Sequence, residues 1–329
     1  MFSRFRRDRR TILTVAVASM MLALSWWRTD VPQKAPEYLE LRAIDHELNA
    51  PLPEGWSLDR VWEIDNPSLH FGGFSAITAA WPDTFHAWSD RGWRLGFEVP
   101  EDRPGSQRVI GGLSRQSIAE GYGGKLWDIE SATLDPLTGH VWLGFEFTHA
   151  IQREHNAYDT REKDVVRILE GEVDWPANSG VEALVRLHDG RFLAFGETAG
   201  EMLVFEGDPV EGSEFVRHRV EWPREGFAVT DAAQLPDGRV IMLMRKLSWG
   251  LPPFSGLMVV ADPMRLETDQ PWRPEVIFVL EDVLPRENYE GIFVQPRPDG
   301  AADVWLISDD NFSAFQRTLL ARMVYSPEE

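Results

Sequence analysis

The feature of this 329-residue chain that most constrains its fold is a turn that recurs about every 50 residues. Short runs rich in Val, Ile, Leu, Trp and Phe are broken at Pro82-Asp83, Asp135 to Gly139, Asp189-Gly190, Pro236-Asp237-Gly238 and Pro298-Asp299-Gly300. The aspartates of these turns are 52, 54, 48 and 62 residues apart. Asp-Gly between apolar runs favours a β-hairpin, because such a turn needs a residue at positive φ. Repeats of this length are typical of four-stranded propeller blades.

Beyond its N-terminal region the chain shows little sustained helical periodicity, so the sequence predicts an all-β protein, a β-propeller. Five hairpins are visible. The segments 56–66 and 318–325 look like strands outside the repeats, and pairing them would close the ring and protect its edge strands. We expect six blades. Five or seven blades are alternatives, and a pair of packed β-sheets is the main alternative fold.

Charged residues recur at a nearly constant distance from these turns. Glu146, Glu197 and Arg245 each lie seven residues after a turn glycine. The other members are Asp90, seven residues after Asp83, and Asp309, nine residues after Gly300. A second series lies seven to ten residues before the turn glycines and contains Glu130, Glu182, Asp231 and Glu290, with Ser75 in the matching place of the first repeat. Hairpin arms of about seven residues would bring both series to the open end of each hairpin.

In a propeller, equivalent ends of the inner strands converge on the central channel. This register therefore gathers one charged set at one mouth of the channel. Its members are Asp90, Arg91, Glu130, Glu146, Glu182, Glu197, Asp231, Arg245, Lys246, Glu290, Asp309, Asp310 and Asn311. So many carboxylates repel one another, and Ca²⁺, which takes six to eight oxygen ligands, would neutralise them. The predicted metal ligands are Asp90, Glu130, Glu146, Glu290 and Asp310.

This charged set predicts hydrolysis of a small anionic ester or phosphoester, with bound metal as Lewis acid or source of hydroxide. The candidate catalytic residues are Glu182, Glu197, Asp309 and His149. The candidate substrate-binding residues are Arg91, Arg245, Lys246 and Asn311. Alternatively, the charges are solvated strand ends, or the carboxylates pair with arginines as structural ion pairs.

The N-terminal sequence predicts an export signal. Residues 1–10 hold five Arg, and an apolar run of seventeen residues follows at 11–27. This pattern is typical of a signal peptide or of a membrane anchor. We expect residues 1–28 to have this role, 29–55 to be a linker and 56–325 to be the propeller. The expected location is the periplasm, with the protein either free or anchored through its N-terminal segment.

Charge and composition exclude several classes of function. Residues 1–28 carry a net charge of +5 in a chain of net charge −20, which leaves −25 on the remainder. Such an acidic body repels phosphate backbones, so nucleic acid is not an expected partner. The chain has no Cys, which excludes disulfides, zinc–thiolate sites and cysteine nucleophiles. It also lacks the G-x-S-x-G nucleophile elbow of common serine esterases.

Several stretches resemble the family called esterase-like activity of phytase. They are FGGFSAI (71–77), SDRGW (89–93), DIESATLDPLTGHVWLGFE (128–146), NSGVEALVRLHDGRFLAFGE (178–197), DAAQLPDGRVIMLMRK (231–246), EGIFV (290–294) and VWLISDDNFSAFQRTLLARMVY (304–325). The resemblance implies ester or phosphoester hydrolysis and a distant relation to calcium-dependent propeller phytases. Its blocks support Asp90, Arg91, Glu182, Glu197, Glu290, Asp309, Asp310 and Asn311 as site residues.

Two other functions stay open at this point. One is a non-catalytic propeller that binds an envelope ligand or partner and holds calcium only for its structure. The other is a lactonase-like hydrolase, in which one metal ion in the channel polarises a cyclic ester. We expect a monomer in each case.

Overall fold

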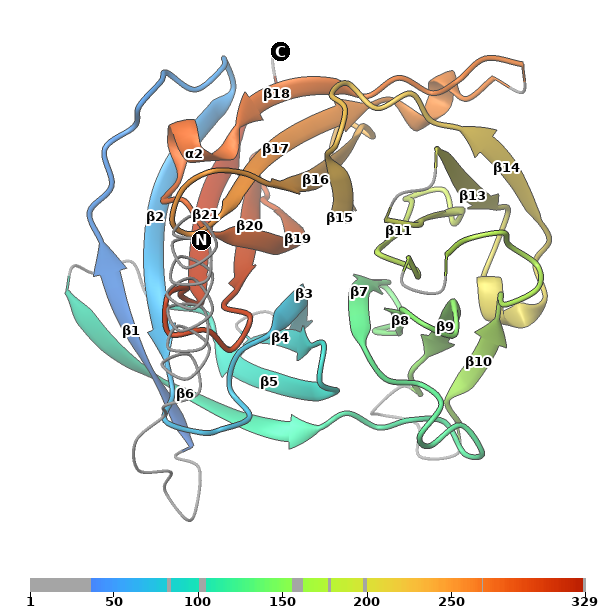
Figure 1. Cartoon of the computed structure of the whole chain (residues 1–329), viewed down its shortest axis with the longest axis horizontal. Helices are drawn as coiled ribbons and strands as arrows, with labels where there is room; N and C mark the ends of the chain where they lie inside the picture. Colours follow the sequence, from blue (N-terminus) through green and yellow to red (C-terminus); the bar gives the residue numbers. More distant parts are fainter. Residues whose placement is uncertain are drawn as a thin grey trace, which may run out of the picture.

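The computed structural model describes residues 37–81, 84–100, 105–155, 162–176, 179–197, 200–267 and 269–327. The predicted export segment, residues 1–28, lies outside them. Within the described residues the chain folds into five four-stranded blades arranged around one axis, two of which β1 joins into one nine-stranded sheet (Figure 1). The innermost strands, β3, β7, β11, β15 and β19, contact one another in a closed circle. The prediction of an all-β propeller is therefore confirmed.

Four of the blades are built from consecutive strands. Blade one contains β3 (Phe74–Trp81), β4 (Thr84–Ser89), β5 (Trp93–Glu98) and β6 (Ser106–Arg115). Blade two contains β7 (Ile129–Leu134), β8 (Val141–Phe145), β9 (Ala150–Arg153) and β10 (Val165–Ile168). Blade three contains β11 (Ala183–Arg186), β12 (Phe192–Phe195), β13 (Glu201–Phe205) and β14 (Phe215–Arg219). Blade four contains β15 (Ala228–Gln234), β16 (Val240–Leu247), β17 (Phe254–Ala261) and β18 (Glu275–Val279).

The fifth blade joins the two ends of the described chain. It contains β19 (Asn288–Pro296), β20 (Ala302–Asp309), β21 (Leu319–Tyr325) and, as its outer strand, β2 (Trp56–Asp65). The expected closure by 56–66 and 318–325 is confirmed, because β2 pairs antiparallel with β21. The expected six blades are wrong: these two segments complete the hairpin β19–β20 instead of forming a blade of their own.

A further strand, β1 (Tyr38–Ile44), pairs with both β2 and β6 and so ties blade five to blade one along their outer edges. The prediction of a linker over 29–55 is wrong for this stretch. Leu39 and Leu41 are buried while Tyr38, Glu40 and Arg42 are exposed, which is the period-two alternation of a half-buried strand. The helical turns of the described residues are η1 (Pro209–Glu211), η2 (Pro263–Arg265) and α2 (Leu280–Val283). From Glu37 to Pro327, the described residues contain no helix that is long and apolar enough to cross a membrane.

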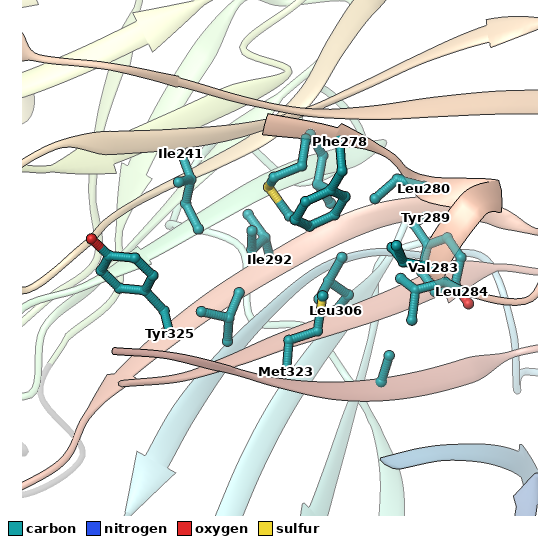
Figure 2. Close-up of a cluster of buried hydrophobic side chains, with 14 of the residues drawn as sticks. Ile241, Phe278, Leu280, Val283, Leu284, Tyr289, Ile292, Leu306, Met323 and Tyr325 are labelled. Atoms are coloured by element: carbon teal, nitrogen blue, oxygen red, sulfur yellow. The ribbon is translucent and has the colours of Figure 1, made fainter. Parts of the chain in front are cut away.

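Apolar side chains fill the space between neighbouring blades. Figure 2 shows this core between blades four and five, where Ile241 and Phe278 meet Ile292, Leu306 and Met323. All five side chains are buried, and each blade pair along the described chain has a comparable cluster. Burial of a large aliphatic side chain contributes about 1.5–3 kcal/mol. This packing fixes the inner strands around the channel and so fixes the site they carry.

Candidate functional site

The candidate site lies at the end of the channel where the five inner strands begin, which we call the mouth. The second strand of each blade ends there and carries the predicted charged series. Asp90 donates its backbone N–H to the Gly73 carbonyl at 2.9 Å, and Glu146 donates to the Asp128 carbonyl at 3.0 Å. In the later blades Glu197 follows β12, Arg245 pairs with Ala228, and Asp309 pairs with Asn288. These five charged residues occupy equivalent positions, as the turn spacing predicted.

The second predicted series lies on the inner strands themselves. Ser75, Glu130 and Glu290 are the extra residues of β-bulges, and Glu182 directly precedes β11. A bulge leaves its extra residue outside the ladder and re-aims that side chain. The bulges therefore explain why Glu130 and Glu290 face the mouth although their neighbours along the strand pack into the blade.

In blade four the bulge position belongs to Thr230, so the placement of Asp231 in this series is wrong by one residue. The Asp231 carboxyl is buried and accepts backbone hydrogen bonds from Ile292 and Ala232, both at 2.8 Å. Burial raises the pKa of Asp231 well above its usual range. Asp231 therefore joins blade four to blade five instead of lining the mouth.

Three carboxylates come together in blade two. Asp128, Glu130 and Glu146 each offer an oxygen, and these oxygens lie within 4.8 Å of one another. Asp128 was not among the predicted site residues. Asp128 directly precedes β7, so counting strand positions from the turn did not mark it. Asp128 has a φ of 68°, a left-handed conformation that Asp tolerates better than most residues.

The approach of blade three to this triad depends on Gly180. A Cβ at Gly180 would lie 2.2 Å from the Cα of Glu146 and 2.6 Å from the Phe145 carbonyl oxygen. Because both contacts are with backbone, a larger residue would have to displace the end of β8. Gly180 thus allows Glu182 to lie beside Glu146, where the negative charge of Glu146 contributes to the raised pKa of Glu182.

The triad fits a hard divalent cation. The oxygen ligands of Ca²⁺ lie about 2.3–2.6 Å from the ion, so two ligand oxygens of one ion are within about 5 Å of each other. The separations among Asp128, Glu130 and Glu146 meet this requirement. Two of the predicted metal ligands, Glu130 and Glu146, therefore meet at one point. The others, Asp90, Glu290 and Asp310, lie on blades one and five.

The mouth strongly disfavours negative charge. Burial, followed by the like charge of Glu182, raises the pKa of Glu130 well above its usual range. Burial likewise raises the pKa of Glu182 and of Asp309 well above the usual range, with Glu197 and Glu290 as the respective leading charged neighbours. Burial is also the main reason that the pKa of Glu146 rises to about 7 and that of Asp90 to about 6. Such displaced pKa values are typical of functional sites.

Arg245 is the cation at the centre of this cluster. Its Nη1 lies 2.9 Å from the Glu290 carboxylate and its Nη2 3.9 Å from that of Glu197. Arg245 therefore joins blades three, four and five. Its charge also opposes the rise in the pKa of Glu146 and of Glu182. One guanidinium thus partly compensates a larger number of carboxylates.

The loop after β20 connects blade five to blade one. Asp310 accepts the backbone N–H of Gly73 at 3.1 Å and that of Phe312 at 2.9 Å, while Asp309 accepts that of Asn311 at 2.6 Å. A Cβ on Gly72 would lie 2.4 Å from Asp310 Oδ1. Asp310, a predicted metal ligand, therefore holds the loop that precedes β3.

Four predicted residues lie at the margin of the carboxylate cluster. The exposed Arg91 guanidinium covers the Phe312 ring at 3.3 Å, and Lys246 Nζ lies 4.4 Å from the centre of the Phe227 ring. Asn311 is exposed and donates to Gln316. The buried His149 ring packs against Trp175, with centroids 6.1 Å apart. The structure thus groups the predicted carboxylates with Arg245 but gives these four residues other contacts.

A family model described as phytase-like, esterase-like activity of phytase, matches residues 69–312, which hold the whole carboxylate cluster. The chain belongs to this family. The resemblance inferred from its sequence blocks is thereby confirmed, and the phytase-like region spans the chain from the connection before β3 to the loop after β20.

Several solved structures resemble the phytase-like chain in fold. A putative gluconolactonase is 12% identical, with 88% of this chain and 100% of that chain covered and a TM-score of 0.45. An endo-arabinase from Bacteroides thetaiotaomicron is 11% identical, with 79% and 96% covered and a TM-score of 0.49. The calcium-binding protein regucalcin from Agrobacterium tumefaciens is 12% identical, with 88% and 96% covered and a TM-score of 0.45. No curated protein sequence matches the chain significantly.

Proposed function

We propose that this phytase-like propeller hydrolyses small anionic esters or phosphoesters at its mouth and holds Ca²⁺ there. The observation that carries the proposal is the convergence of Asp128, Glu130 and Glu146 within 4.8 Å, next to a cluster that contains Arg245. Carboxylates alone would repel an anionic substrate. A bound divalent cation together with Arg245 would make the same mouth attractive to one.

In this proposal Asp128, Glu130 and Glu146 hold the cation, which when bound would supply Lewis acidity and an acidified water. Arg245 binds the negative oxygens of the substrate, and Arg91 contacts them from the margin of the carboxylate cluster. The ion pair of Arg245 with Glu197, at 3.9 Å, is longer than its ion pair with Glu290, at 2.9 Å.

Glu182 and Asp309 are the candidate proton donors. Burial raises the pKa of both carboxyls well above the usual range, which favours their protonated forms. A carboxyl of this kind can protonate the leaving oxygen of an ester, as general acids do. Glu197 lies 3.9 Å from Nη2 of Arg245. It is the candidate to accept the proton of the attacking water.

The test is hydrolysis by the full chain of p-nitrophenyl phosphate, p-nitrophenyl acetate and a simple lactone. Each is measured after chelation and again after Ca²⁺ is restored. We expect activity only with the metal, and a loss of a hundredfold or more in kcat/KM for Glu130→Gln. Glu221→Gln is the matched control, because Glu221 pairs with Arg273 on the exposed surface. Full activity in the chelated protein would contradict the metal-dependent reaction.

The second candidate function is a non-catalytic propeller that binds an envelope ligand and holds calcium for its structure. The observation that favours it is the position of Arg245, Glu290 and Glu197 across three blades, where charge neutralisation would strengthen the ring. This function predicts a calcium-dependent melting temperature with no turnover of any ester in the panel. Turnover of the lactone alone would instead identify a lactonase-like hydrolase.

We also propose that the chain is exported and acts in the periplasm as a monomer. The support is the sequence of residues 1–28, with its five early arginines and its apolar run. Cell fractionation would test the location, and N-terminal sequencing of the isolated protein would show whether this segment is retained. Recovery of the intact protein from the cytosol would contradict export.

A further inference from the structure

Large apolar side chains are exposed on the loops at the mouth. In blade two, Trp127 directly precedes Asp128 and is 52% exposed, and Phe147 directly follows Glu146 and is 38% exposed. Their rings stack on each other, with centroids 4.4 Å apart and planes 12° apart. They therefore form one apolar projection beside the carboxylate triad.

The last residue of β16 and the loop between β16 and β17 in blade four form a second projection. Leu247 is 77% exposed, Trp249 is 100% exposed and Leu251 is 81% exposed. In blade five, Phe315 is 53% exposed in the loop between β20 and β21. All of these segments lie at the mouth, because β7 begins there and β8, β16 and β20 end there. We call these six side chains the apolar rim.

The rim surrounds the channel from three blades. Because these segments belong to blades two, four and five at the same end of the channel, a flat partner that covers this end would contact all of them. Trp is the residue that most favours the boundary between lipid and water, because it combines a large apolar ring with one polar N–H. The rim therefore fits a lipid surface better than it fits a dissolved substrate.

The path of the chain supports this partner. Glu40 of β1 pairs with Asp65 at the mouth end of β2, and the Tyr38 carbonyl accepts a hydrogen bond from Asn66 at 3.0 Å. The described chain therefore enters the propeller on the mouth side. Only residues 28–37 separate this point from the apolar run of 11–27. Ten residues span at most about 35 Å, so a bilayer that held this run would lie close to the mouth.

We propose that the mouth face docks on an electrically neutral lipid bilayer, with the apolar rim inserted at the boundary between lipid and water. Neutral lipid is specified because the chain carries a net charge of −20, which an anionic surface would repel. Docking would place the carboxylate cluster at the lipid surface. It does not depend on whether the cluster is catalytic.

The absence of Cys from the chain allows a direct test with single-cysteine variants. Trp249→Cys and Leu251→Cys in the full chain are labelled with an environment-sensitive fluorophore and mixed with phosphatidylcholine vesicles. The matched controls are Leu137→Cys and Met264→Cys, at positions that are 90% and 77% exposed. Leu137 lies in the turn between β7 and β8, and Met264 lies in η2 after β17, both at the opposite end of the channel. All four positions are solvent-exposed, so the variants are expected to fold.

Docking predicts a blue shift and at least twofold quenching by spin-labelled lipid at positions 249 and 251. It predicts neither effect at 137 and 264, and weaker effects with phosphatidylserine vesicles at low salt. Equal responses on the two faces, or no response to phosphatidylcholine, would overturn the proposal. A blue shift without vesicles that grows with protein concentration would also overturn it, because the rim would then be an interface between copies of the chain. The same readings in chelated protein separate this result from the proposed hydrolysis.

Discussion

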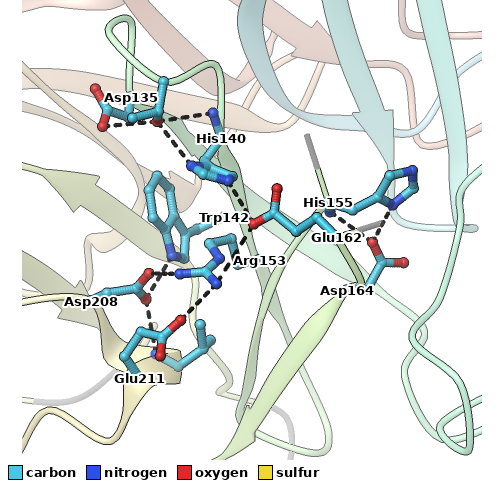
Figure 3. Close-up of polar contacts among 11 residues, drawn as sticks. Asp135, His140, Trp142, Arg153, His155, Glu162, Asp164, Asp208 and Glu211 are labelled. Atoms are coloured by element: carbon cyan, nitrogen blue, oxygen red, sulfur yellow. Dashed lines mark hydrogen bonds and ion pairs between the residues drawn. The ribbon is translucent and has the colours of Figure 1, made fainter. Parts of the chain in front are cut away.

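Two charged regions of this propeller differ in how many of their carboxylates are paired with a cation. Between blades two and three, Arg153 binds Asp208 through Nη1 and Glu211 through Nη2 at 2.7 Å (Figure 3). The Trp142 indole donates to the same Asp208 at 2.9 Å. At the mouth, one arginine, Arg245, pairs with both Glu290 and Glu197, and the described residues there include several more carboxylates.

We interpret the Arg153 network as structural and the mouth as functional. A matched network satisfies the charges that it brings together and can hold two blades in place. At the mouth, several carboxylates are buried close to one another. Burial and repulsion between them destabilise their charged forms and raise the pKa of Glu130, Glu182 and Asp309. Unfavourable charge of this kind is typical of sites that bind a cation or transfer protons.

The largest effect is expected from Arg245→Met. This change removes the partner of the buried Glu290 carboxylate and leaves more negative charge uncompensated at the mouth. Breaking a buried pair costs about 3–5 kcal/mol of the free energy of unfolding. Urea denaturation of the metal-free protein would measure it. A cost below about 1 kcal/mol would show that the mouth is as well solvated as an ordinary surface.

Arg153→Met should have a smaller effect, of about 1–2 kcal/mol, measured by the same denaturation experiment. Its partner Glu211 is 61% exposed and can be solvated by water when the arginine is lost. The effect should also be the same with and without Ca²⁺. A calcium-dependent cost at Arg153 would break the distinction between the two regions.

The pH dependence of stability should be the smallest effect. In the folded protein the pKa of Asp90 is about 6 and that of Glu146 about 7, above the ordinary values of 3.8 and 4.5. Folded protein therefore binds more protons than unfolded protein between about pH 4 and pH 7, and stability falls as pH rises through this window. We expect the melting temperature of the metal-free protein to drop by about 2–5 °C from pH 5 to pH 8. A rise over this range would contradict the raised pKa values.

The turn spacing was enough to predict the propeller and the equivalent positions of several charged residues in its blades. Each first hairpin has arms of similar length, so counting from the turn placed Asp90, Glu146, Glu197, Arg245 and Asp309 at equivalent positions. Counting failed on the inner strand of blade four, because a bulge inserts one residue and gives the mouth position to Thr230 instead of Asp231. A bulge has no mark in a single sequence, since its cause is the pairing with the next strand.

The blade count and β1 depended on contacts between distant parts of the chain. The fifth blade needs β2 and β21 to pair across almost the whole chain, and the sequence shows two isolated strands without saying which hairpin they join. Likewise, the alternation of Leu39 and Leu41 was visible, but the partners of β1 lie at residues 61–65 and 106–110. Asp128 was missed because it stands just before its strand and not within it.

The most direct test of the account is a melting curve of the chelated full chain during titration with Ca²⁺. A ligand of the folded state stabilises it by about 2.7 kcal/mol at a hundred times its Kd. We predict a saturable rise in melting temperature for the natural chain and for Glu221→Gln. Glu130→Gln should lose most of this rise while its metal-free melting temperature is unchanged or higher, because one repelling charge is gone. An equal rise in Glu130→Gln, or no rise in the natural chain, would contradict a cation site at the mouth.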